Sequence, residues 1–564
     1  MKIQDKIIDI INKVYAGILT DNNVEDNVNT CVLEVPNNKD FGDFSTNLAM
    51  RSAGILKKAP MQIGEMFKKK LLADKNAKEF FSEIKLVNPG FINFYLKPES
   101  LLPYIKEIIE KKDLYGRSDI GNGKKVNIEF VSANPTGPLH VGHGRGAVLG
   151  DILANLYEFI GFDVTREYYV NDCGRQINIL GNTVKKWINA IDENKDPVFE
   201  EQDENGEKKE WYKGAYMKEV VASIVEKYGK EHTVIEFGEY AGQLILENIK
   251  KDLSDFGVKE FDVWTSEKKF YSEDEVNKII ALLEDKDFIY EKDGAKWVKS
   301  SMFGDEKDRV VIRSNGEPTY LASDIAYHNE KITRGFDKLI NIWGADHHGY
   351  VPRLKASITA LKYDQNILDV ILCQLVKLVR NNVPVQMSTR AGEFVTLKKV
   401  VDEVGRDTAR FFFIMRKADA QLDFDLEIAK KHSLDNPVYY IQYAHARICS
   451  IFKHINENLT IQYDSKDSDK IDLNLLVSKE EQDLFKLMLN FQDVVENSAL
   501  SNEPHRITVY LQELASCFHT FYNKHKVTSG EKELILARLF LVDTIRIVIK
   551  NGLFILGINA LEEM

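Results

Sequence analysis

Cysteine is scarce in this chain, with 5 residues among 564, and no two of them form a CxxC pair. Zinc sites built on cysteine and the disulfide frameworks of small secreted proteins both need closely spaced cysteines, so the sequence argues against both. Scattered cysteines are typical of a reducing compartment. We therefore expect a cytoplasmic protein with no disulfide scaffold and no protein metal site.

Long apolar runs and an excess of positive charge are also lacking. No stretch of 18 apolar residues occurs, so no membrane-spanning helix is expected. The first residues, MKIQDKIIDIINKVYAGIL, place charges inside an apolar pattern and predict an amphipathic helix rather than a signal peptide. The net charge is −12, whereas proteins that coat DNA are basic. We expect neither a DNA nor a membrane partner, although local basic patches could still bind a polyanion.

A length of 564 residues is enough for three or four domains, and the pattern changes along the chain. Residues 1–112 combine the amphipathic helix with IKLVNPGFINFYLK, which predicts two strands joined by a Pro-Gly turn. This part is predicted to be a small α+β domain. Residues 116–125, GRSDIGNGKK, are predicted to be a Gly-rich linker.

Residues 122–400 have the pattern of an open parallel sheet. VNIEFVSA and VTREYYVND predict strands on either side of the helical pattern GAVLGDILANLYEFIGF, which makes a βαβ unit. A helical insertion is expected at about 183–265, after which the sheet pattern resumes at VVIRSNGEPTYLASDIAYH and DKLINIWGADHHGY. Residues 401–564 carry apolar residues at i, i+3 and i+4, which predicts an α-helical bundle. The predicted fold class is multidomain α/β, with a Rossmann-like catalytic domain between the α+β domain and the bundle.

The stretch NPTGPLHVGHGRG, residues 134–146, places two histidines three residues apart between a strand and a helix. Its prolines and first glycine predict an irregular turn, and Gly142 and Gly144 let a ligand approach the backbone. A helix that begins near His140 offers free N–H groups and partial positive charge, which suit a phosphate. His140 and His143 share one face of its first turn and could donate hydrogen bonds to phosphoryl oxygens as charge builds up during transfer.

Two other interpretations of the histidines stay open. They could form a metal-binding pair, but no carboxylate or cysteine stands at the usual companion spacing. They could also be ordinary surface histidines, because a short HxxH pattern matches many helices by chance. The order of strand, Pro/Gly turn, histidine pair and helix favours the phosphate interpretation.

The pattern P-x-x-H-x-G-H resembles the first signature of class I aminoacyl-tRNA synthetases, which bind ATP on a Rossmann-like sheet. Their second signature, K-M-S-K-S, is similar to QMSTR at residues 386–390. Other stretches resemble the arginyl-tRNA synthetases over essentially the whole chain, among them EYYVNDCGRQ, PTYLASDIAYH, WGADHHGYVPRLKA and NPVYYIQYAHARI. The resemblance implies a monomer that ligates L-arginine to its tRNA with ATP, through an arginyl-adenylate.

A guanidinium is a planar fork of donors that pairs best with carboxylates. The resemblance implies that Asp324 and Tyr320, one helical turn apart, hold the arginine side chain. It places Glu129 and Asn134 near the α-amino end. The full set that it implies for arginine is Glu129, Ser132, Asn134, His143, Tyr320, Asp324 and His347. The plain alternatives are a surface charge for Glu129 and a core aromatic for Tyr320.

For ATP the resemblance implies contacts from the histidine motif, from WGADHHG and from the second signature. These residues are Gly142, Gly144, His140, His143, His347, His348, Met387 and Ser388. WGADHHG follows an apolar strand, and ligands of open α/β sheets bind at the carboxyl ends of strands. Asn171, Asp172 and Gln176 follow another strand, so we rank them as pocket residues of lesser weight.

The second signature departs from the family in a way that removes positive charge. Gln386 and Thr389 stand where the family has its two lysines, and Gly137 stands where some arginyl enzymes carry a compensating lysine. Arg390 keeps one cation, and an arginine binds phosphate well through its fork of donors. We therefore expect Arg390 to act in catalysis beside the two histidines, with Mg²⁺ helping to neutralise the phosphates of ATP.

Two regions are predicted to contact tRNA. In NPGFINF, Phe91 and Asn93 stand at the family's contacts to the tRNA D-loop, and a plain hairpin is the alternative. In NPVYYIQYAHARI, Tyr439, Tyr443 and His445 stand among cations, and unpaired RNA bases stack on such rings. Tyrosines at helical spacing are usually core residues, so both interpretations stay open.

Two rival functions remain. Another class I synthetase would keep the histidine chemistry without the specificity for arginine. The two acids Glu129 and Asp324 and the N-terminal region argue against it. A catalytically inactive RNA-binding relative would explain the missing lysines, but the intact histidine pair argues against it. The expected partners are therefore arginine tRNA, L-arginine and ATP.

Overall fold

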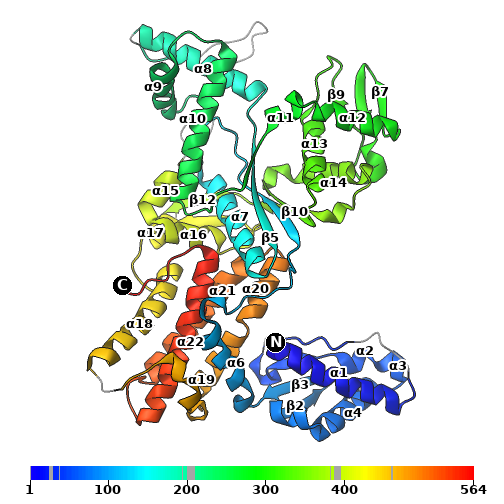
Figure 1. Cartoon of the computed structure of the whole chain (residues 1–564), viewed down its shortest axis with the longest axis vertical. Helices are drawn as coiled ribbons and strands as arrows, with labels where there is room; N and C mark the ends of the chain where they lie inside the picture. The colour runs from blue at the N-terminus through cyan, green and yellow to red at the C-terminus, as the bar shows by residue number, and fades with distance from the viewer. Residues whose placement is uncertain are drawn as a thin grey trace.

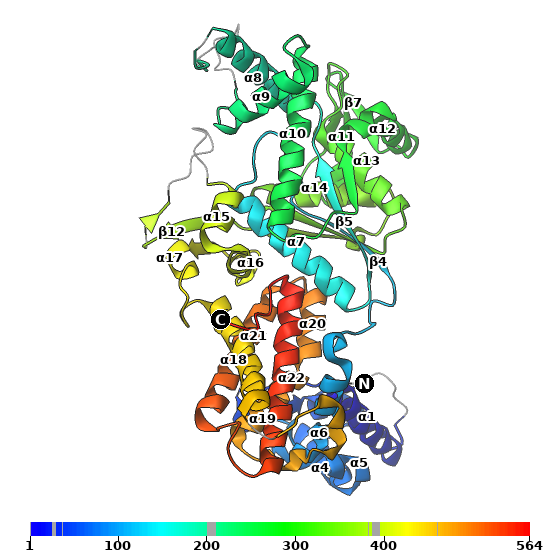
Figure 2. The ribbon, with the colours of Figure 1, turned by 60° about the vertical axis from the view of Figure 1, so that its left-hand side comes forward.

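The computed structural model describes residues 2–24, 30–36, 38–193, 195–199, 210–381, 383–385, 395–458 and 461–564. The molecule is elongated (Figure 1). The N-terminal domain and the C-terminal helices share one end, the central sheet lies in the middle, and two insertions form the other end (Figure 1 and Figure 2). Within the described ranges, none of the helices combines the length and the apolar character that crossing a membrane needs.

The N-terminal domain is an α+β unit, as predicted. Helices cover an antiparallel sheet of order β1-β3-β2, and Ile11, Phe67 and Phe94 are fully buried in its core. The predicted Pro-Gly turn joins β2 to β3. The elements are α1 (Ile3–Asp21), β1 (Phe44–Thr46), α2 (Leu48–Arg51), α3 (Ala53–Leu56), α4 (Pro60–Ala73), α5 (Lys75–Phe80), β2 (Phe81–Val87) and β3 (Phe91–Leu96). Helix α6 (Pro98–Lys111) then leads to the bundle.

The central domain is built on a five-stranded sheet of order β11-β10-β4-β5-β6, in which every neighbouring pair is parallel. This confirms the predicted Rossmann-like sheet. Both faces of such a sheet are covered, which explains the apolar runs in VNIEF and KLINIW. The strands are β4 (Lys125–Glu129), β5 (Asp163–Val170), β6 (Val263–Ser266), β10 (Lys338–Gly344) and β11 (Leu368–Cys373).

Helix α7 (Val141–Phe159) follows β4 and is buried along most of its length. It lies between the sheet and the C-terminal helices (Figure 1 and Figure 2). Gly150 allows its closest approach to the strand layer, because a Cβ at this position would lie 2.1 Å from the ring of Phe130. A Cβ at Gly146, one turn earlier, would meet no atom within 4 Å.

Two insertions interrupt the sheet. The first is helical, as predicted, and consists of α8 (Arg175–Asp192), α9 (Tyr216–Tyr228) and α10 (Val234–Asp255), so the predicted start near 183 falls inside α8. The second was not predicted. It packs α11 (Glu267–Ser272) and α12 (Glu275–Asp285) beside an antiparallel sheet of β7 (Ile289–Lys292), β8 (Ala295–Val298) and β9 (Arg309–Ile312). The prediction that VVIR resumes the central sheet is therefore wrong, because β9 pairs with β8.

The region after β11 is also not purely helical. A small sheet of order β13-β12-β14 contains β12 (Val376–Arg380), β13 (Val383–Pro384) and β14 (Leu422–Asp425). Residues 401–564 were predicted to be helical throughout, but in β14 Leu422 and Phe424 are buried while Asp423 is exposed, an alternation that suits a strand. Gly405, with φ of 82°, divides the single predicted helix into α15 (Leu397–Val404) and α16 (Arg406–Ile414). Helix α17 (Leu426–Ala429) follows β14.

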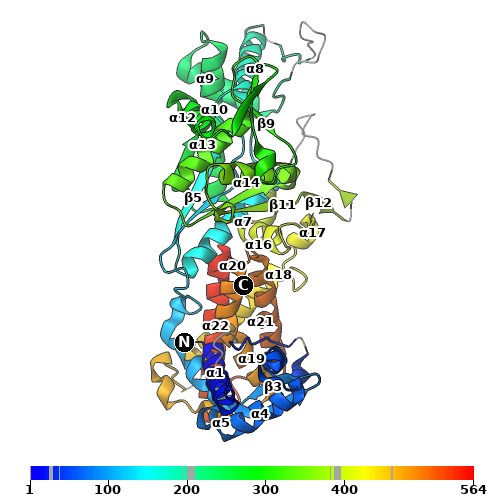
Figure 3. The same cartoon turned by 90° about the vertical axis from the view of Figure 1, so that its right-hand side faces the viewer.

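The C-terminal helices form the predicted bundle (Figure 3). They are α18 (Pro437–Asn458), α19 (Lys479–Leu489), α20 (Phe491–Leu500), α21 (His505–Lys524) and α22 (Lys532–Leu556). A buried arginine joins this bundle to the central domain. Arg410 of α16 donates to Asp151 Oδ2 of α7 at 2.5 Å and to the carbonyl oxygens of Gly257 and Leu556 at 2.9 and 3.0 Å. The end of α22 is therefore fixed to α7.

We expect Gly150→Ala to lower the thermal unfolding temperature markedly, because the added methyl group would push α7 away from Phe130. The cost should be at least about 1–3 kcal/mol, the usual range for overpacking a core. Gly146→Ala on the same helix is the matched control and should be neutral or stabilising by up to about 1 kcal/mol, because alanine favours helix. Equal unfolding temperatures for the two variants would contradict the close packing of α7.

Candidate active site

The two histidines lie at the N-terminus of α7 and contact each other. His140 is the N-cap residue, and its Nδ1 accepts a hydrogen bond of 3.1 Å from Gly142 N. His143 Nδ1 accepts one of 3.3 Å from His140 N. The rings stack with centroids 3.7 Å apart. Because both Nδ1 atoms are acceptors, a neutral ring at either position carries its proton on Nε2.

Burial keeps both imidazoles neutral. It lowers the pKa of His140, and together with the nearby charge of His140 it lowers the pKa of His143 to about 3. At neutral pH the pair therefore offers two N–H donors, beside the free N–H groups and positive partial charge of the helix N-terminus. This arrangement can stabilise an anion but cannot act as a pair of general bases.

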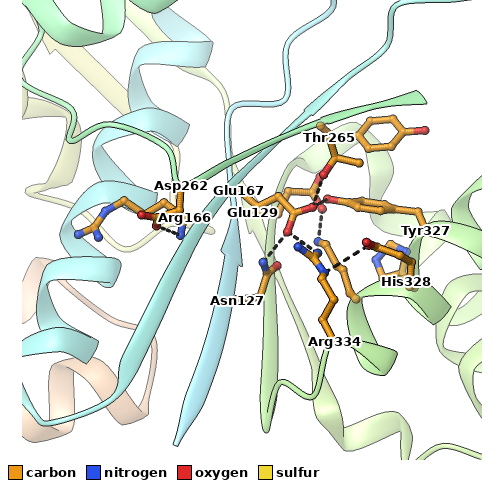
Figure 4. A network of polar contacts seen from close by, with 12 residues as sticks. Asn127, Glu129, Arg166, Glu167, Asp262, Thr265, Tyr327, His328 and Arg334 are labelled. Carbon is orange, nitrogen blue, oxygen red and sulfur yellow. Dashed lines mark hydrogen bonds and ion pairs between the residues drawn. The ribbon is translucent and has the colours of Figure 1, made fainter. Parts of the chain in front are cut away.

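Two acidic residues lie on neighbouring strands and are both buried. Glu129 of β4 and Glu167 of β5 stand opposite each other in the sheet register. Arg334, just after α13 (Tyr320–Thr333), donates to Glu167 Oε2 at 2.6 Å, and Asn127, Thr265 and Tyr327 also donate to this carboxylate (Figure 4). Lys331 of α13 donates to Glu129 Oε2 at 2.5 Å and is fully buried. Two negative charges thus meet two positive charges.

A chain of hydrogen bonds runs from Lys331 along α13 towards its N-terminus. Lys331 Nζ donates to Asn341 Oδ1 at 3.3 Å, so Asn341 Nδ2 faces His328 Nε2 at 2.8 Å. His328 Nε2 is then an acceptor, and the ring donates from Nδ1 to the carbonyl oxygen of Asp324 at 2.8 Å. Burial, with a contribution from Lys331, lowers the pKa of His328 to about 3 and keeps this neutral tautomer. This series of hydrogen bonds fixes α13 against β10.

Asp324 and Glu267 are two acidic residues that form no ion pair with any described side chain. Tyr350 Oη donates to Asp324 Oδ2 at 2.5 Å, and Ser323 Oγ donates to Glu267 Oε1 at 3.5 Å. Glu267 Oε2 is buried without a partner among the described atoms. Burial raises the pKa of each carboxyl group to about 7, and the negative charge of nearby acids adds to the shift. Two carboxyl groups are therefore left without a cationic partner in the described part of the chain.

Sequence reasoning did not identify Glu267, although a signal was present. Glu267 directly follows β6, and Glu129 ends β4, so the rule that ligands bind at the carboxyl ends of parallel strands applies to both. Burial of an acid without a counter-charge could not be read from the sequence. Tyr350 and Lys331 were likewise unrecognised, because their roles depend on contacts between α13 and distant elements.

The other residues predicted for arginine are divided between this network and the surface. Ser132 Oγ donates to Glu129 Oε1 at 3.1 Å and accepts from Tyr169 N at 3.1 Å. Asn134, His347 and Tyr320 are exposed, Tyr320 to 55%. The structure therefore joins Glu129, Ser132 and Asp324 in one network and leaves these three side chains around it without a direct contact to it.

The described residues that were predicted for ATP follow two strands, β4 and β10. Gly142 and Gly144 are in the first turn of α7, where a Cβ on Gly144 would lie 2.6 Å from Leu397 Cδ1, so a larger residue there would force the Leu397 side chain to shift. His347 and His348 are exposed in the turn after β10. Met387, Ser388 and Arg390, with Gln386 and Thr389, lie outside the described residues. The segment that follows them returns to the histidines, since Leu397 N donates to Leu139 O at 2.8 Å.

The three pocket residues of lesser weight lie after β5. Asp172 accepts from Ser266 Oγ at 2.6 Å and from Lys268 N at 3.0 Å. Gln176, in the first turn of α8, has a buried Oε1 without a partner among the described atoms. Asn171 is half-buried. Asp172 therefore ties β5 to β6 beside Glu267.

Two residues predicted for tRNA are enclosed by the protein. Asn93 is 3% exposed, and its Oδ1 accepts from Ser45 Oγ at 2.7 Å. His445 is 2% exposed, and its Nδ1 lies 2.8 Å from the carbonyl oxygen of Leu561. Both side chains are therefore held inside the protein as the structure stands, and their contacts to tRNA stay a prediction. Phe91 is half-buried.

The two tyrosines predicted for tRNA keep part of their surface. Tyr439 and Tyr443 of α18 are half-buried and stack with centroids 6.2 Å apart. Arg447 lies over the Tyr443 ring at 5.0 Å. A ring flanked by a guanidinium can stack on a base, so their prediction stands.

Three family models match consecutive parts of the chain. They are the arginyl tRNA synthetase N-terminal domain at residues 1–96, the catalytic domain of class I (R) tRNA synthetases at residues 104–423, and the DALR anticodon-binding domain at residues 441–564. The arginine–tRNA ligase of Geobacter sp. (strain M21) is 49% identical over 544 residues, 94% of each chain. That of Bacillus subtilis (strain 168) is 42% identical over 577 residues, 100% of each. The solved arginyl-tRNA synthetase of Thermus thermophilus shares the fold, with a TM-score of 0.75 over 100% of both chains at 20% identity.

The parallel sheet, with a histidine pair opening the helix after its first strand, is the architecture of a class I aminoacyl-tRNA synthetase, and the matched catalytic model agrees. The N-terminal model and the full-length relatives go beyond the class. The chain belongs to the arginyl-tRNA synthetase family. It ligates L-arginine to tRNA with ATP, by the adenylate reaction that is general for class I enzymes.

We expect Lys331→Met to lower the stability of the protein by about 3–5 kcal/mol, because it leaves Glu129 buried and unpaired. Adding Glu129→Gln should restore much of this loss, since the uncompensated charge is then gone. Thermal unfolding of both variants would measure the effect.

Lys398→Met is the control for this pair of variants, because its ion pair with Asp402 is largely exposed and should contribute little. If the double variant were no more stable than Lys331→Met, the neutralising role of Lys331 would be wrong.

Proposed function

We propose that Asp324 and Glu267 together bind the guanidinium group of arginine. The observation that carries this proposal is the pair of carboxyl groups without a counter-charge at the carboxyl edge of the sheet. A guanidinium supplies one positive charge and a fork of donors, which is what the pair lacks. Tyr320, at the exposed start of α13, would then cover the side chain of the substrate.

The α-amino end of arginine is proposed to lie towards Glu129, Ser132 and Asn134. Because Lys331 neutralises Glu129, this carboxylate offers hydrogen-bond acceptors without competing for the guanidinium. His143 and His347 complete the proposed set of arginine contacts. The polarity of the site thus orients the substrate, with its side chain at the uncompensated acids and its carboxylate free to reach ATP.

For ATP we propose contacts from Gly142, Gly144, His140, His143, His347, His348, Met387 and Ser388. In the first step a carboxylate oxygen of arginine attacks the α-phosphorus in line, and pyrophosphate leaves with the bonding electrons. The neutral imidazoles of His140 and His143 donate hydrogen bonds to phosphoryl oxygens as negative charge builds up there. In the second step the terminal ribose hydroxyl of tRNA attacks the acyl carbon and AMP leaves. Positioning and charge stabilisation account for both steps without a protein nucleophile.

Arg390 is proposed to supply positive charge to the phosphates in place of the two missing lysines. Mg²⁺ is proposed as a second source. Among the described residues no group of three or more His, Cys, Asp or Glu side chains is placed to hold a metal ion. These residues do not fit a protein metal site, so we assign Mg²⁺ to the nucleotide phosphates, through which this cation commonly binds.

For tRNA we retain Phe91, Tyr439 and Tyr443 as proposed contacts. We also propose that the enzyme acts as a monomer in the cytoplasm, without a DNA or membrane partner. The scarcity of cysteine supports the proposed compartment, and the net charge of −12 supports the absence of a DNA partner.

We expect exchange of labelled pyrophosphate into ATP to require arginine and arginine tRNA together. His140→Ala and Arg390→Ala should each lower the exchange rate at least about 100-fold, as the loss of one transition-state donor commonly does. His232→Ala, in the helical insertion, is the matched control and should keep the rate. Full exchange by Arg390→Ala would show that another group replaces the missing lysines. Bound tRNA without any exchange by the wild type would favour the inactive RNA-binding relative.

We expect the affinity for arginine to fall as pH decreases below about 7. The free carboxyl groups have pKa values near 7, and guanidinium binding requires their ionised forms, so binding releases protons below that pH. Each proton released weakens binding by up to about tenfold per pH unit, and affinity should be constant above about pH 8. Calorimetry between pH 5.5 and 8.5 would measure it. Asp324→Asn should bind arginine weakly with a shallower pH dependence, whereas a flat wild-type profile would exclude these carboxyl groups as the guanidinium site.

A further inference from the structure

The helical insertion contacts the turn that precedes the histidine pair. Tyr216, the first residue of α9, donates a hydrogen bond of 2.5 Å from its Oη to the carbonyl oxygen of Thr136. Thr136 lies in the segment of residues 134–138, which joins the β4 side of the site to His140. The insertion therefore reaches the residues that set the start of α7, although it is far from them in sequence.

This turn has few hydrogen bonds of its own. Pro135 and Pro138 have no N–H group, so two of its residues cannot donate from the backbone. Thr136 N donates to Asn134 O at 2.7 Å within the turn. An outside donor to the carbonyl oxygen of Thr136 thus restrains a segment that its own backbone holds weakly.

Two glycines make room for the Tyr216 ring. A Cβ at Gly137 would lie 3.2 Å from Tyr216 Oη, and a Cβ at Gly214 would lie 2.3 Å from a carbon of the ring. Neither glycine has the positive φ that would by itself require glycine. The space that the ring occupies accounts for both. The position where some related enzymes carry a lysine is thus covered here by a tyrosine.

The hydroxyl group is a permanent donor. Burial raises the pKa of Tyr216, and the charge of Tyr212 adds to the shift, so the phenol stays protonated over the working range of the enzyme. Its contact with Thr136 is a hydrogen bond that does not depend on pH.

We propose that Tyr216 is a positioning residue for arginine activation. It holds the turn of residues 134–138 and, through this turn, the orientation of His140 and His143. Small displacements of groups that stabilise charge in a transition state are costly, even when the substitution lies outside the reacting atoms. The inference rests on the role proposed above for the two histidines, and it gives the helical insertion a task in the chemical step.

Tyr216→Phe tests this directly, because it removes the hydroxyl group and keeps the ring. In tRNA-dependent exchange, kcat should fall about tenfold, which corresponds to about 1.4 kcal/mol of barrier. The KM for tRNA and the thermal unfolding temperature should not change, since the fold and the RNA-binding surfaces stay intact. Tyr228→Phe is the matched control on the same helix, where the ring stacks on Tyr240 at 3.9 Å, and it should keep the wild-type kcat.

A double-mutant cycle with Gly137 sharpens the test. Gly137→Ala should lower kcat by a similar factor, because the new methyl group presses on Tyr216 Oη. In the Tyr216→Phe background that pressure is gone, so the double variant should be no slower than Tyr216→Phe alone. Additive losses would mean that the two positions act independently and would overturn the inference. So would an unchanged kcat of Tyr216→Phe.

His140→Ala separates this inference from the function on which it rests. If His140→Ala abolishes exchange while Tyr216→Phe is fully active, only the role of Tyr216 is wrong. If His140→Ala is active, the proposed role of the histidines fails as well.

Discussion

Two acids on adjacent strands cannot be buried side by side unless something neutralises them, and this requirement organises the active site. Desolvation of a carboxylate is costly, so Glu129 and Glu167 need partners inside the protein. Lys331 and Arg334, three residues apart, supply both charges. Their pairing fixes the position of α13 over the sheet. The N-terminal end of α13, with Asp324, is then held at a set distance from the strand ends.

The same constraint determines where negative charge remains. Because the inner pair of acids is neutral overall, the potential in the site comes from Asp324 and Glu267. Glu267 is buried and Asp324 is half-buried. In the proposed function a cationic substrate completes this set. Under that proposal, specificity for arginine depends on the charge that the described residues leave uncompensated, more than on the charges that they pair.

The sequence was sufficient to predict those features of the fold and the site that depend on local residue patterns. The βαβ unit, the start of α7 at the histidines and the spacing of Tyr320 and Asp324 on one helix all follow from short-range periodicity. Contacts between segments that are distant in the sequence could not be predicted from it. Glu267 meets Ser323 only because α11 and α13 pack together, and Asn93 and His445 have polar side chains that gave no hint of their burial. β9 was assigned to the wrong sheet because a strand pattern does not identify its partner.

Because burial keeps His140 and His143 neutral, a pH–rate profile of this enzyme must be interpreted differently. An inflection near neutrality is usually assigned to histidine, whose ordinary pKa lies there. Here His143 protonates only near pH 3, whereas two carboxyl groups titrate near 7. Protonation of a carboxylate releases little heat and that of an imidazole releases much more. The inflection should therefore stay almost fixed when the assay is warmed, a behaviour that would identify oxygen rather than nitrogen as the titrating atom.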